Sequence, residues 1–428
     1  MTVTIMPGNI SGALSAIPSK SHLHRLLICA ALSDRETFVD CAETEAEDIH
    51  ATIACLTALG AETERRESGF AVKPIDRRQL AKEAFLPCGE SGSTLRFMLP
   101  VVCALGVNGI FEMKGRLPQR PLSPLDAQLE SGGIRLWREK PEILRCEGRL
   151  TPGNYHLSGG ISSQYITGLL LALPLLEGAS RLEVTKPIES ADYIAMTEEA
   201  ARAFGSDPAV QQTSDRVIYN IQGVGVFASP VRLGAEGDWS NSAFWLCAGA
   251  MPGGDVLLRG LKKDSRQGDK EVCGILAQMG AAVNWEDNAL QIKEGKRCGM
   301  EIDAGAIPDL GPVLAAVASV SAGTTVIQNA ARLRLKESDR LFSTAKTLTT
   351  LGADVRETED TLIIKGRPHL NGGAVDAFGD HRIAMMAAVA SAACTGPVTI
   401  SGAQAVNKSY PAFWKDLAAL GKDVRVEA

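Results

Sequence analysis

The sequence lacks the marks of several large protein classes. None of its ten cysteines are paired as CxxC, so no disulfide framework is indicated, and a reducing cytoplasm is the expected compartment. The longest apolar run, residues 166–176, is too short to span a bilayer, and the strand-like start MTVTI has no signal-peptide pattern. The net charge of −6 gives no basic excess, so neither a nucleic acid nor a membrane is an expected partner.

Familiar cofactor and nucleophile motifs are missing too. The chain has no GxxxxGKS/T loop, no GxGxxG after a strand and no GxSxG elbow. Sites for nucleoside triphosphates, for dinucleotides and for serine hydrolysis are therefore not indicated. His22 and His24 are two residues apart and point to different sides of a helix, which disfavours a metal pair.

What the sequence does contain is a repeat of about 70 residues. Six glycines each follow a helix-like run in which apolar residues recur three or four positions apart. Glycine at such a point can adopt the left-handed conformation that ends a helix. These glycines, at steps of 72, 73, 75, 72 and 69 residues, are Gly60, Gly132, Gly205, Gly280, Gly352 and Gly421.

A second helix type precedes the first in each repeat. It is apolar nearly all round, which predicts a buried helix. Short strands flank it, such as Ala13–Leu14 before the first buried helix and 231–233 before the fourth. One unit therefore reads strand, buried helix, strand, amphipathic helix, strand or hairpin. Six units predict two domains of three, divided near 231–238, with helices inside and sheets outside. The buried helices are expected to begin near Ser21, Gly92, Ser162, Trp239, Asp309 and His381.

Polar residues at the starts of the buried helices differ between repeats. Ser and Asp are ordinary N-caps, and capping is the prediction for Asp238 and Ser240. Capping does not explain Lys20 or Arg382, because a cation is unfavourable beside the positive end of a helix dipole. An anion between them would explain both. Ser162–Gln164, after two glycines, offers hydroxyl, amide and backbone donors that suit a phosphate.

One amphipathic-helix leader stands apart from the others. It packs two cations and two carboxylates into the five residues Lys336–Arg340. On a helix Lys336, Asp339 and Arg340 share one face, while Glu337 lies about 100° round. Such a cluster can bind an anion and still offer a titratable carboxyl group.

These motifs, in this order, resemble those of the 5-enolpyruvylshikimate-3-phosphate (EPSP) synthase family over essentially the whole chain. The segments that carry the resemblance are Pro18–Ser21, Gly89–Ser93, Ser162–Tyr165, Pro308–Asp309, Leu335–Arg340 and Asp380–Arg382. The resemblance implies an α/β fold: a two-domain inside-out α/β barrel of six βαβαββ units, three per domain, joined by two crossover strands. It implies an N-terminal domain at 17–232, a C-terminal domain of 1–16 plus 233–428, and hinges near 17–20 and 231–238.

The resemblance also implies an activity, transfer of the enolpyruvyl group of phosphoenolpyruvate to the 5-hydroxyl of shikimate 3-phosphate in aromatic amino acid biosynthesis. No metal or organic cofactor is implied, because phosphate is already a leaving group, and a monomer is expected. The positions that align with the shikimate 3-phosphate site are Lys20, Ser21, Arg25, Ser162, Ser163, Gln164, Ser190, Tyr193, Asp309 and Lys336. Those that align with the phosphoenolpyruvate site are Lys20, Gly92, Arg120, Gln164, Arg340, Arg382 and Lys408. Asp309 and Glu337 align with the proton-transfer carboxylates, with Lys20 and His381 nearby.

Three positions depart from the family pattern. Glu90 stands where many members have Asn, and it either lies outside the site or pairs with an arginine. Arg332 replaces an Asn of some members, so no substrate contact is assigned to it. His24 replaces a residue that is commonly small or polar.

Alternative functions can be weighed against the same residues. The related UDP-N-acetylglucosamine 1-carboxyvinyltransferase has a reactive Cys in the loop before its arginine, whereas Lys114–Arg120 has none. A catalytically inactive phosphometabolite-binding protein would be expected to have lost a carboxylate or an arginine, and none is missing. A ring-like scaffold such as a DNA clamp is disfavoured by the acidic charge.

Overall fold

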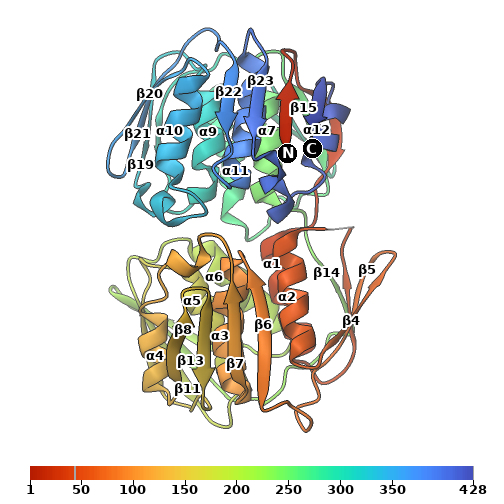
Figure 1. The fold of residues 1–428 in the computed structure, drawn as a ribbon, viewed down its shortest axis with the longest axis vertical. Coiled ribbons are helices and arrows are strands. Elements are labelled where there is room, and N and C mark those ends of the chain that lie inside the picture. The colour runs from red at the N-terminus through yellow and green to blue at the C-terminus, as the bar shows by residue number, and fades with distance from the viewer. Residues whose placement is uncertain (43–44, 428) are drawn as a thin grey trace. The chain divides into compact units, whose positions relative to one another are not determined.

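The computed structural model describes residues 1–42 and 45–427, and it divides into two compact units. The N-terminal unit is Lys20–Ala235, and the C-terminal unit is Met1–Ser19 together with Glu236–Ala428 (Figure 1). Each unit has its own hydrophobic core. The chain passes between the units at 19/20 and 235/236, three residues beyond the boundaries expected at 16/17 and 232/233.

Within the described residues, each unit has three four-stranded sheets, all of one topology. The first two strands in each sheet order are parallel, and the remaining two pairings are antiparallel. The N-terminal sheets, in spatial order, are β14 (Arg232–Gly234), β3 (Thr37–Asp40), β5 (Gly69–Lys73) and β4 (Glu62–Arg66); β6 (Glu83–Gly89), β7 (Asn108–Met113), β9 (Ile143–Glu147) and β8 (Arg135–Lys140); and β10 (Asn154–Ser158), β11 (Ser180–Thr185), β13 (Arg216–Ile221) and β12 (Ala209–Gln212).

The C-terminal sheets repeat this arrangement. In spatial order they are β2 (Ser11–Ser15), β15 (Asp255–Arg259), β17 (Ala289–Lys293) and β16 (Ala282–Glu286); β18 (Glu301–Asp303), β19 (Thr324–Gln328), β21 (Leu362–Lys365) and β20 (Asp354–Glu357); and β22 (Gly373–Asp376), β23 (Val398–Ser401), β1 (Thr2–Ile5) and β24 (Val424–Glu427).

The helices follow the predicted alternation of buried and amphipathic types. Every residue of α7, α9 and α11 is buried, and these three helices pack against one another inside the C-terminal unit. The buried set is α1 (Lys20–Ala31), α3 (Gly92–Leu105), α5 (Ser163–Ala172), α7 (Trp239–Ala250), α9 (Gly311–Ala318) and α11 (His381–Ala390). The amphipathic set is α2 (Glu47–Ala58), α4 (Leu125–Ser131), α6 (Ala191–Ala203), α8 (Val272–Gln278), α10 (Arg340–Thr350) and α12 (Phe413–Ala419). The 3-10 turns are η1 (Leu117–Gln119), η2 (Leu173–Leu175), η3 (Gly268–Glu271), η4 (Pro308–Leu310), η5 (Ala331–Leu335), η6 (Ser391–Ala393) and η7 (Ala403–Lys408). The expected α/β fold of six βαβαββ repeats is thus confirmed.

Two strands belong to a different repeat from the one that their sequence position suggested. Ala13–Leu14, expected in the first repeat, lies in β2 and pairs in parallel with β15 of the fourth. Residues 231–233, expected in the fourth repeat, lie at β14, which pairs in parallel with β3 of the first. The repeat pattern alone misplaced these strands, because a short extended segment carries no local signal for the sheet that it joins.

The helix-ending glycines are also where the repeat predicts them, with one exception. Five have φ between +80° and +101°, as a left-handed helix end requires. In the second repeat the left-handed residue is Gly133, with φ +97°, and Gly132 has φ −83°. Gly132 is instead constrained by packing, since a Cβ there would lie 2.8 Å from the hydroxyl oxygen of Tyr155.

Candidate active site

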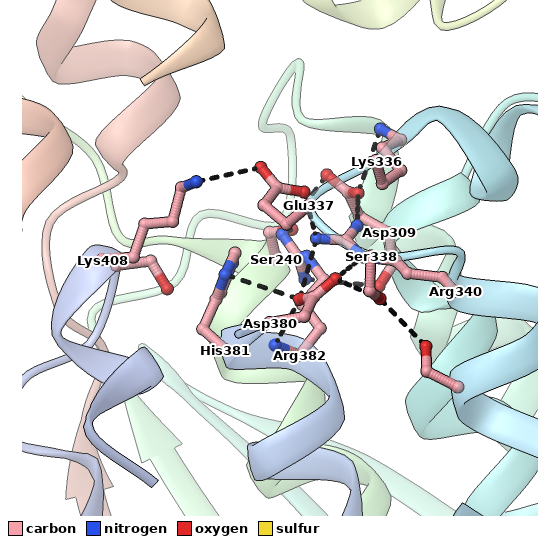
Figure 2. A network of polar contacts seen from close by, with 12 residues as sticks. Ser240, Asp309, Lys336, Glu337, Ser338, Arg340, Asp380, His381, Arg382 and Lys408 are labelled. Carbon is pink, nitrogen blue, oxygen red and sulfur yellow. Dashed lines mark hydrogen bonds and ion pairs between the residues drawn. The ribbon is translucent and has the colours of Figure 1, made fainter. Parts of the chain in front are cut away.

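A buried arginine organises the polar cluster of the C-terminal unit (Figure 2). Arg340 is 1% exposed and contacts three carboxylates. Its Nη1 lies 2.7 Å from Oδ1 of Asp309, its Nη2 lies 2.7 Å from Oε2 of Glu337, and its Nε lies 2.7 Å from Oδ2 of Asp380. One planar guanidinium therefore fixes both predicted proton-transfer carboxylates relative to each other.

The starts of both kinds of helix and one 3-10 turn supply this cluster. Asp309 lies in η4, directly before α9, and Asp380 caps α11 by accepting a hydrogen bond from the backbone nitrogen of Arg382 at 3.0 Å. Glu337 and Arg340 flank the start of α10. Lys408 ends η7, and its Nζ lies 3.5 Å from Oε1 of Glu337. The repeat thus brings equivalent helix ends to one place in this unit, where unsatisfied backbone donors favour anions.

Asp309 has three cationic neighbours within this cluster. Its oxygens lie 3.3 Å from Nζ of Lys336, 2.7 Å from Arg340 and 3.3 Å from Nη2 of Arg382. Burial alone would raise the pKa of Asp309, but these three cations outweigh it and hold that pKa well below its usual range. Burial also lowers the pKa of Lys336 to about 8, against the opposing effect of Asp309.

His381 and Arg382 open α11 behind these carboxylates. The Nδ1 of His381, which is 2% exposed, lies 3.7 Å from Oδ1 of Asp380. Arg382 donates from Nη2 to Oγ of Ser240 at 2.7 Å and lies over the ring of Phe244. Asp238 caps α7, as predicted, but the capping prediction for Ser240 was wrong, since its hydroxyl binds Arg382.

In the N-terminal unit, Lys20 is the first residue of α1 and is held by an acid from α2. Its Nζ lies 2.6 Å from Oδ2 of Asp48, which is 5% exposed. Asp48 also anchors α3, because its carbonyl oxygen accepts a hydrogen bond from Thr94. Sequence reasoning missed Asp48, since an acid in the first turn of a helix is ordinary.

Predicted phosphoenolpyruvate residues of the N-terminal unit gather at the start of α3. Gln164 donates from its side-chain nitrogen to Ser93 at 2.9 Å and accepts from Nη1 of Arg96 at 2.8 Å. A Cβ on Gly92 would lie 2.7 Å from Nη1 of Arg96 and 2.8 Å from Nη1 of Arg120. The structure therefore brings Gly92, Arg120 and Gln164 together and adds Arg96, which no motif had indicated.

Gly92→Ala is predicted to weaken phosphoenolpyruvate use selectively. The added methyl group would displace both guanidinium groups, while alanine is otherwise well suited to a helix. We expect KM for phosphoenolpyruvate to rise by about tenfold, with KM for shikimate 3-phosphate nearly unchanged. Steady-state kinetics with each substrate varied in turn measures this, and a rise below twofold would contradict it.

The predicted shikimate 3-phosphate residues of this unit lie on α1, α5 and α6. Arg25 is buried, with Nε 2.8 Å from Oγ1 of Thr197 and hydrogen bonds to the carbonyl oxygens of Ser21 and Tyr193. It thereby ties α1 to α6. Ser190, at φ +53°, precedes α6. Ser162 caps α5 by accepting from the backbone nitrogen of Gln164, and the buried Ser163 opens that helix.

The three departures from the family pattern have different surroundings. His24 is fully buried, its Nδ1 lies 2.7 Å from Oγ1 of Thr52, and burial lowers its pKa to about 3. The carboxylate of Glu90 lies against Gly115, in the loop that leads to Arg120. Arg332 lies in η5 and is half-buried.

Neither a metal cluster nor a membrane span is found in the part of the chain that the structure describes. Across 1–42 and 45–427, no three His, Cys, Asp or Glu side chains are grouped as metal ligands. Over the same residues, no helix combines the length and the apolar character needed to cross a bilayer.

Comparison with known proteins identifies the family. Residues 5–417 match the family model described as EPSP synthase (3-phosphoshikimate 1-carboxyvinyltransferase). The 3-phosphoshikimate 1-carboxyvinyltransferases of Clostridium kluyveri and Clostridium novyi are 41% and 39% identical to this chain, covering 99% and 98% of it and 98% and 97% of their own lengths. The chain belongs to the EPSP synthase family.

A solved structure carries the same fold. The EPSP synthase of Acinetobacter baumannii matches with a TM-score of 0.80 and 27% identity, over 99% of this chain and 100% of that one. The resemblance inferred from the motifs is therefore confirmed, and with it the enzyme class: the chain is a transferase of aromatic amino acid biosynthesis.

Proposed function

We propose that this chain transfers the enolpyruvyl group of phosphoenolpyruvate to the 5-hydroxyl of shikimate 3-phosphate and releases phosphate. The observation that carries the proposal is the pairing of Asp309 and Glu337 with four cations at converging helix ends, in a chain of this family. The carboxylates supply proton transfer, and the cations supply sites for anionic substrates.

The proposed division of labour follows the clusters. Phosphoenolpyruvate is bound by Arg340, Arg382 and Lys408 of the C-terminal unit and by Lys20, Gly92, Arg120 and Gln164 of the N-terminal unit. The positions proposed to bind shikimate 3-phosphate are Lys20, Ser21, Arg25, Ser162, Ser163, Gln164, Ser190, Tyr193, Asp309 and Lys336. Of these, Lys20 and Gln164 are also proposed to contact phosphoenolpyruvate. Arginine suits these roles because its planar fork donates two bonds to a carboxylate or phosphate.

The addition step and the elimination step each need two proton transfers. The 5-hydroxyl loses a proton while the methylene carbon of phosphoenolpyruvate gains one, which gives a tetrahedral intermediate. In the elimination the methyl group gives up a proton and the departing phosphate takes one, so both carboxyl groups return to their starting protonation states while the 5-oxygen stays bonded to the enolpyruvyl carbon. We propose that Asp309 takes the hydroxyl proton, that Glu337 serves the carbon, and that Lys20 assists the departing phosphate, with His381 nearby.

A phosphate-release assay with both substrates tests the activity directly. We expect phosphate to form only when shikimate 3-phosphate and phosphoenolpyruvate are both present. UDP-N-acetylglucosamine as the acceptor is the matched negative control, because the loop Lys114–Arg120 has no cysteine. Phosphate release with UDP-N-acetylglucosamine and phosphoenolpyruvate, but not with shikimate 3-phosphate and phosphoenolpyruvate, would overturn the proposal.

A change of conformation on substrate binding is a separate proposal. Residues of both units are assigned to the same pair of small molecules, so segments near 17–20 and 231–238 are proposed to act as hinges. Small-angle scattering should show a smaller radius of gyration when shikimate 3-phosphate and a non-reacting phosphoenolpyruvate analogue are added. Identical profiles with and without ligands would contradict the hinge role of these segments.

The pKa of Lys336 predicts an alkaline limit to shikimate 3-phosphate use. Because burial lowers this pKa to about 8, Lys336 is charged below that pH and loses its charge above it. We therefore expect kcat/KM for shikimate 3-phosphate to fall as pH rises through about 8. Lys336→Arg should move this limit to higher pH, since arginine stays protonated. A pH–rate profile with an unmoved limit would exclude Lys336 as its source.

We also propose that the protein acts as a cytoplasmic monomer. All ten cysteines are free, which fits a reducing compartment. Light scattering of the purified protein tests the oligomeric state.

A further inference from the structure

A line of four fully buried polar side chains, the buried bridge, crosses the N-terminal unit from α1 to the start of α3. Its members are His24 of α1, Thr52 of α2, Thr94 of α3 and Ser91, the residue that caps α3. Nδ1 of His24 lies 2.7 Å from Oγ1 of Thr52, and that oxygen lies 2.7 Å from Oγ1 of Thr94. Oγ1 of Thr94 in turn lies 2.8 Å from Oγ of Ser91. Each of these buried contacts needs one proton between its two atoms.

The order of the protons is fixed at the α3 end of the buried bridge. The hydroxyl of Thr94 has two acceptors, Oγ of Ser91 at 2.8 Å and the carbonyl oxygen of Asp48 at 3.3 Å. A threonine hydroxyl has only one proton, so Oγ1 of Thr94 must accept its remaining bond from Thr52. Oγ1 of Thr52 must then accept from His24, which therefore carries its proton on Nδ1.

His24 is suited to this place as a neutral donor. Burial lowers the pKa of its imidazole to about 3, so at neutral pH only one ring nitrogen is protonated. Its Nε2 is a buried atom without a hydrogen-bond partner among the residues that the structure describes. The opposite tautomer would put an N–H group there with no acceptor and would take the proton of Thr94 away from Ser91.

The first bond of the buried bridge is also one of two rungs between α1 and α2. The other rung is the ion pair of Lys20 with Asp48, whose Nζ and Oδ2 are 2.6 Å apart. His24 lies four residues after Lys20, and Thr52 lies four residues after Asp48, so the two rungs are one helical turn apart on facing sides. Together they fix the register of α2 against α1, and this places the hydroxyl of Thr52 for its bond to α3.

The far end of the buried bridge is the proposed phosphoenolpyruvate loop. Ser91 caps α3 by accepting the backbone N–H of Thr94 at 3.2 Å. The next residue is Gly92, where a Cβ would lie 2.7 Å from Nη1 of Arg96 and 2.8 Å from Nη1 of Arg120. The cap sets the direction of the backbone N–H groups in the first turn of the helix, and these groups favour an anion beside the two guanidinium groups.

We infer that His24 is a positioning residue for phosphoenolpyruvate binding, acting through Thr52 and Thr94 to hold the cap of α3 and with it the loop Gly89–Ser93. The inference rests on the proposed binding of phosphoenolpyruvate at Gly92. His24 is fully buried, so its effect is transmitted by the hydroxyl groups of the buried bridge.

The shikimate 3-phosphate side of α1 is held by different contacts. Arg25 donates from Nε to Oγ1 of Thr197 at 2.8 Å and from Nη2 to the carbonyl oxygen of Tyr193 at 2.9 Å, both on α6. These bonds do not involve the buried bridge. Its loss should therefore weaken the use of phosphoenolpyruvate and spare that of shikimate 3-phosphate.

Paired substitutions separate the hydrogen bonds of the buried bridge from its packing. Thr52→Val keeps the shape and removes the hydroxyl, whereas Thr52→Ser keeps the hydroxyl. His24→Leu removes the ring donor, whereas the amide of His24→Asn can donate from near the position of Nδ1. We expect Thr52→Val and His24→Leu each to raise KM for phosphoenolpyruvate about tenfold, with kcat and KM for shikimate 3-phosphate within about threefold. Thr52→Ser and His24→Asn should each keep KM for phosphoenolpyruvate within about threefold of the unmodified enzyme.

A double-mutant cycle and a matched control exclude a general loss of stability. His24→Leu combined with Thr52→Val should be no worse than the more impaired single variant, because both break the same series of bonds. Thr37→Val is the control, because Thr37 is fully buried in β3 of the same unit with its Oγ1 2.6 Å from Oγ of Ser229. It should lower the free energy of unfolding, as Thr52→Val does, but leave both KM values unchanged.

Nitrogen NMR of protein labelled at its histidines checks the order of the protons. The signals of His24, assigned by their absence from the His24→Asn variant, should show a protonated Nδ1 and an unprotonated Nε2 at neutral pH. A merely space-filling histidine would have no reason to prefer this tautomer. A protonated Nε2 would reverse the buried bridge and overturn the inference.

The outcomes separate this inference from the proposed site. If Gly92→Ala leaves KM for phosphoenolpyruvate unchanged, the placement of the substrate at α3 is wrong and the inference falls with it. If Gly92→Ala raises this KM but a folded Thr52→Val does not, only the positioning role is wrong. An equal rise in both KM values, additive effects in the cycle, or a tenfold rise in the Thr37→Val control would also overturn that role. Thr52→Val decides the matter even if His24→Leu fails to fold.

Discussion

Replacement of Arg340 by methionine is expected to destabilise the C-terminal unit by about 3–5 kcal/mol and to abolish measurable turnover. Arg340 is 1% exposed and holds Asp309, Glu337 and Asp380 at 2.7 Å. Methionine fills much of the same space but leaves these carboxylates without their shared cation. Removing one partner from a buried ion cluster leaves uncompensated charges and strongly lowers the free energy of unfolding. Replacing the whole cluster by apolar residues would cost far less.

Tryptophan fluorescence during urea unfolding measures this cost in the relevant unit. Four of the five tryptophans, at 239, 245, 285 and 414, lie in the C-terminal unit, and a Trp137→Phe background leaves only those four. Arg367→Met is the matched control, because Arg367 and Asp354 form an ion pair in which both side chains are about half exposed. That control should cost less than about 1 kcal/mol. An equal loss in both variants would show that Arg340 is not the centre of the network.

The pH dependence of the Arg340→Met variant gives an independent check. In the unmodified protein, burial is outweighed by Arg340 and other cations, so the pKa values of Asp309 and Asp380 are lowered. Their ionised forms stabilise the native state above about pH 4, and this stability is lost as pH falls through the lowered values. Without Arg340, burial raises at least one of these pKa values. The loss in free energy of unfolding relative to the unmodified protein should therefore be largest near pH 8 and shrink toward about pH 4.

The repeat made the fold predictable, and the limits of that prediction are equally physical. Buried helices are apolar on all sides, and amphipathic helices end at left-handed glycines, so both types could be placed from local patterns. The exchange of β2 and β14 between repeats had no local signal, because pairing partners hundreds of residues apart leave the strand composition unchanged.

The candidate site shows the same division between local and distant information. Lys20 and Arg382 were identifiable because cations at helix starts contradict the helix dipole, and Arg340 was identifiable because it belongs to a dense cluster of charges. Asp48 and Ser240 were not, because an acid in the first turn of a helix and a serine near a helix start are ordinary. What distinguishes them is a partner contributed by another helix, such as Lys20 for Asp48 and Arg382 for Ser240.

Replacement of Glu337 by glutamine is expected to separate catalysis from binding. Oε2 of Glu337 accepts from Arg340 at 2.7 Å, and Oε1 faces Nζ of Lys408 at 3.5 Å. Glutamine can keep its oxygen on Arg340, so the fold should persist, but it cannot exchange a proton with the methylene carbon. We expect kcat to fall by about 10²-fold or more, while shikimate 3-phosphate, which is proposed to bind other residues, should keep its affinity within about threefold.

Calorimetry of shikimate 3-phosphate binding and deuterium exchange together identify the step that Glu337 serves. Reversible addition in deuterated water should carry label into the methylene group of recovered phosphoenolpyruvate, because the transient methyl group loses any of its hydrogens on return. The Glu337→Gln variant should bind shikimate 3-phosphate but show almost no label. Glu301→Gln, at an exposed position on β18, is the matched control and should retain full exchange. Loss of shikimate 3-phosphate binding together with turnover would mean that Glu337 holds substrate rather than moving its proton.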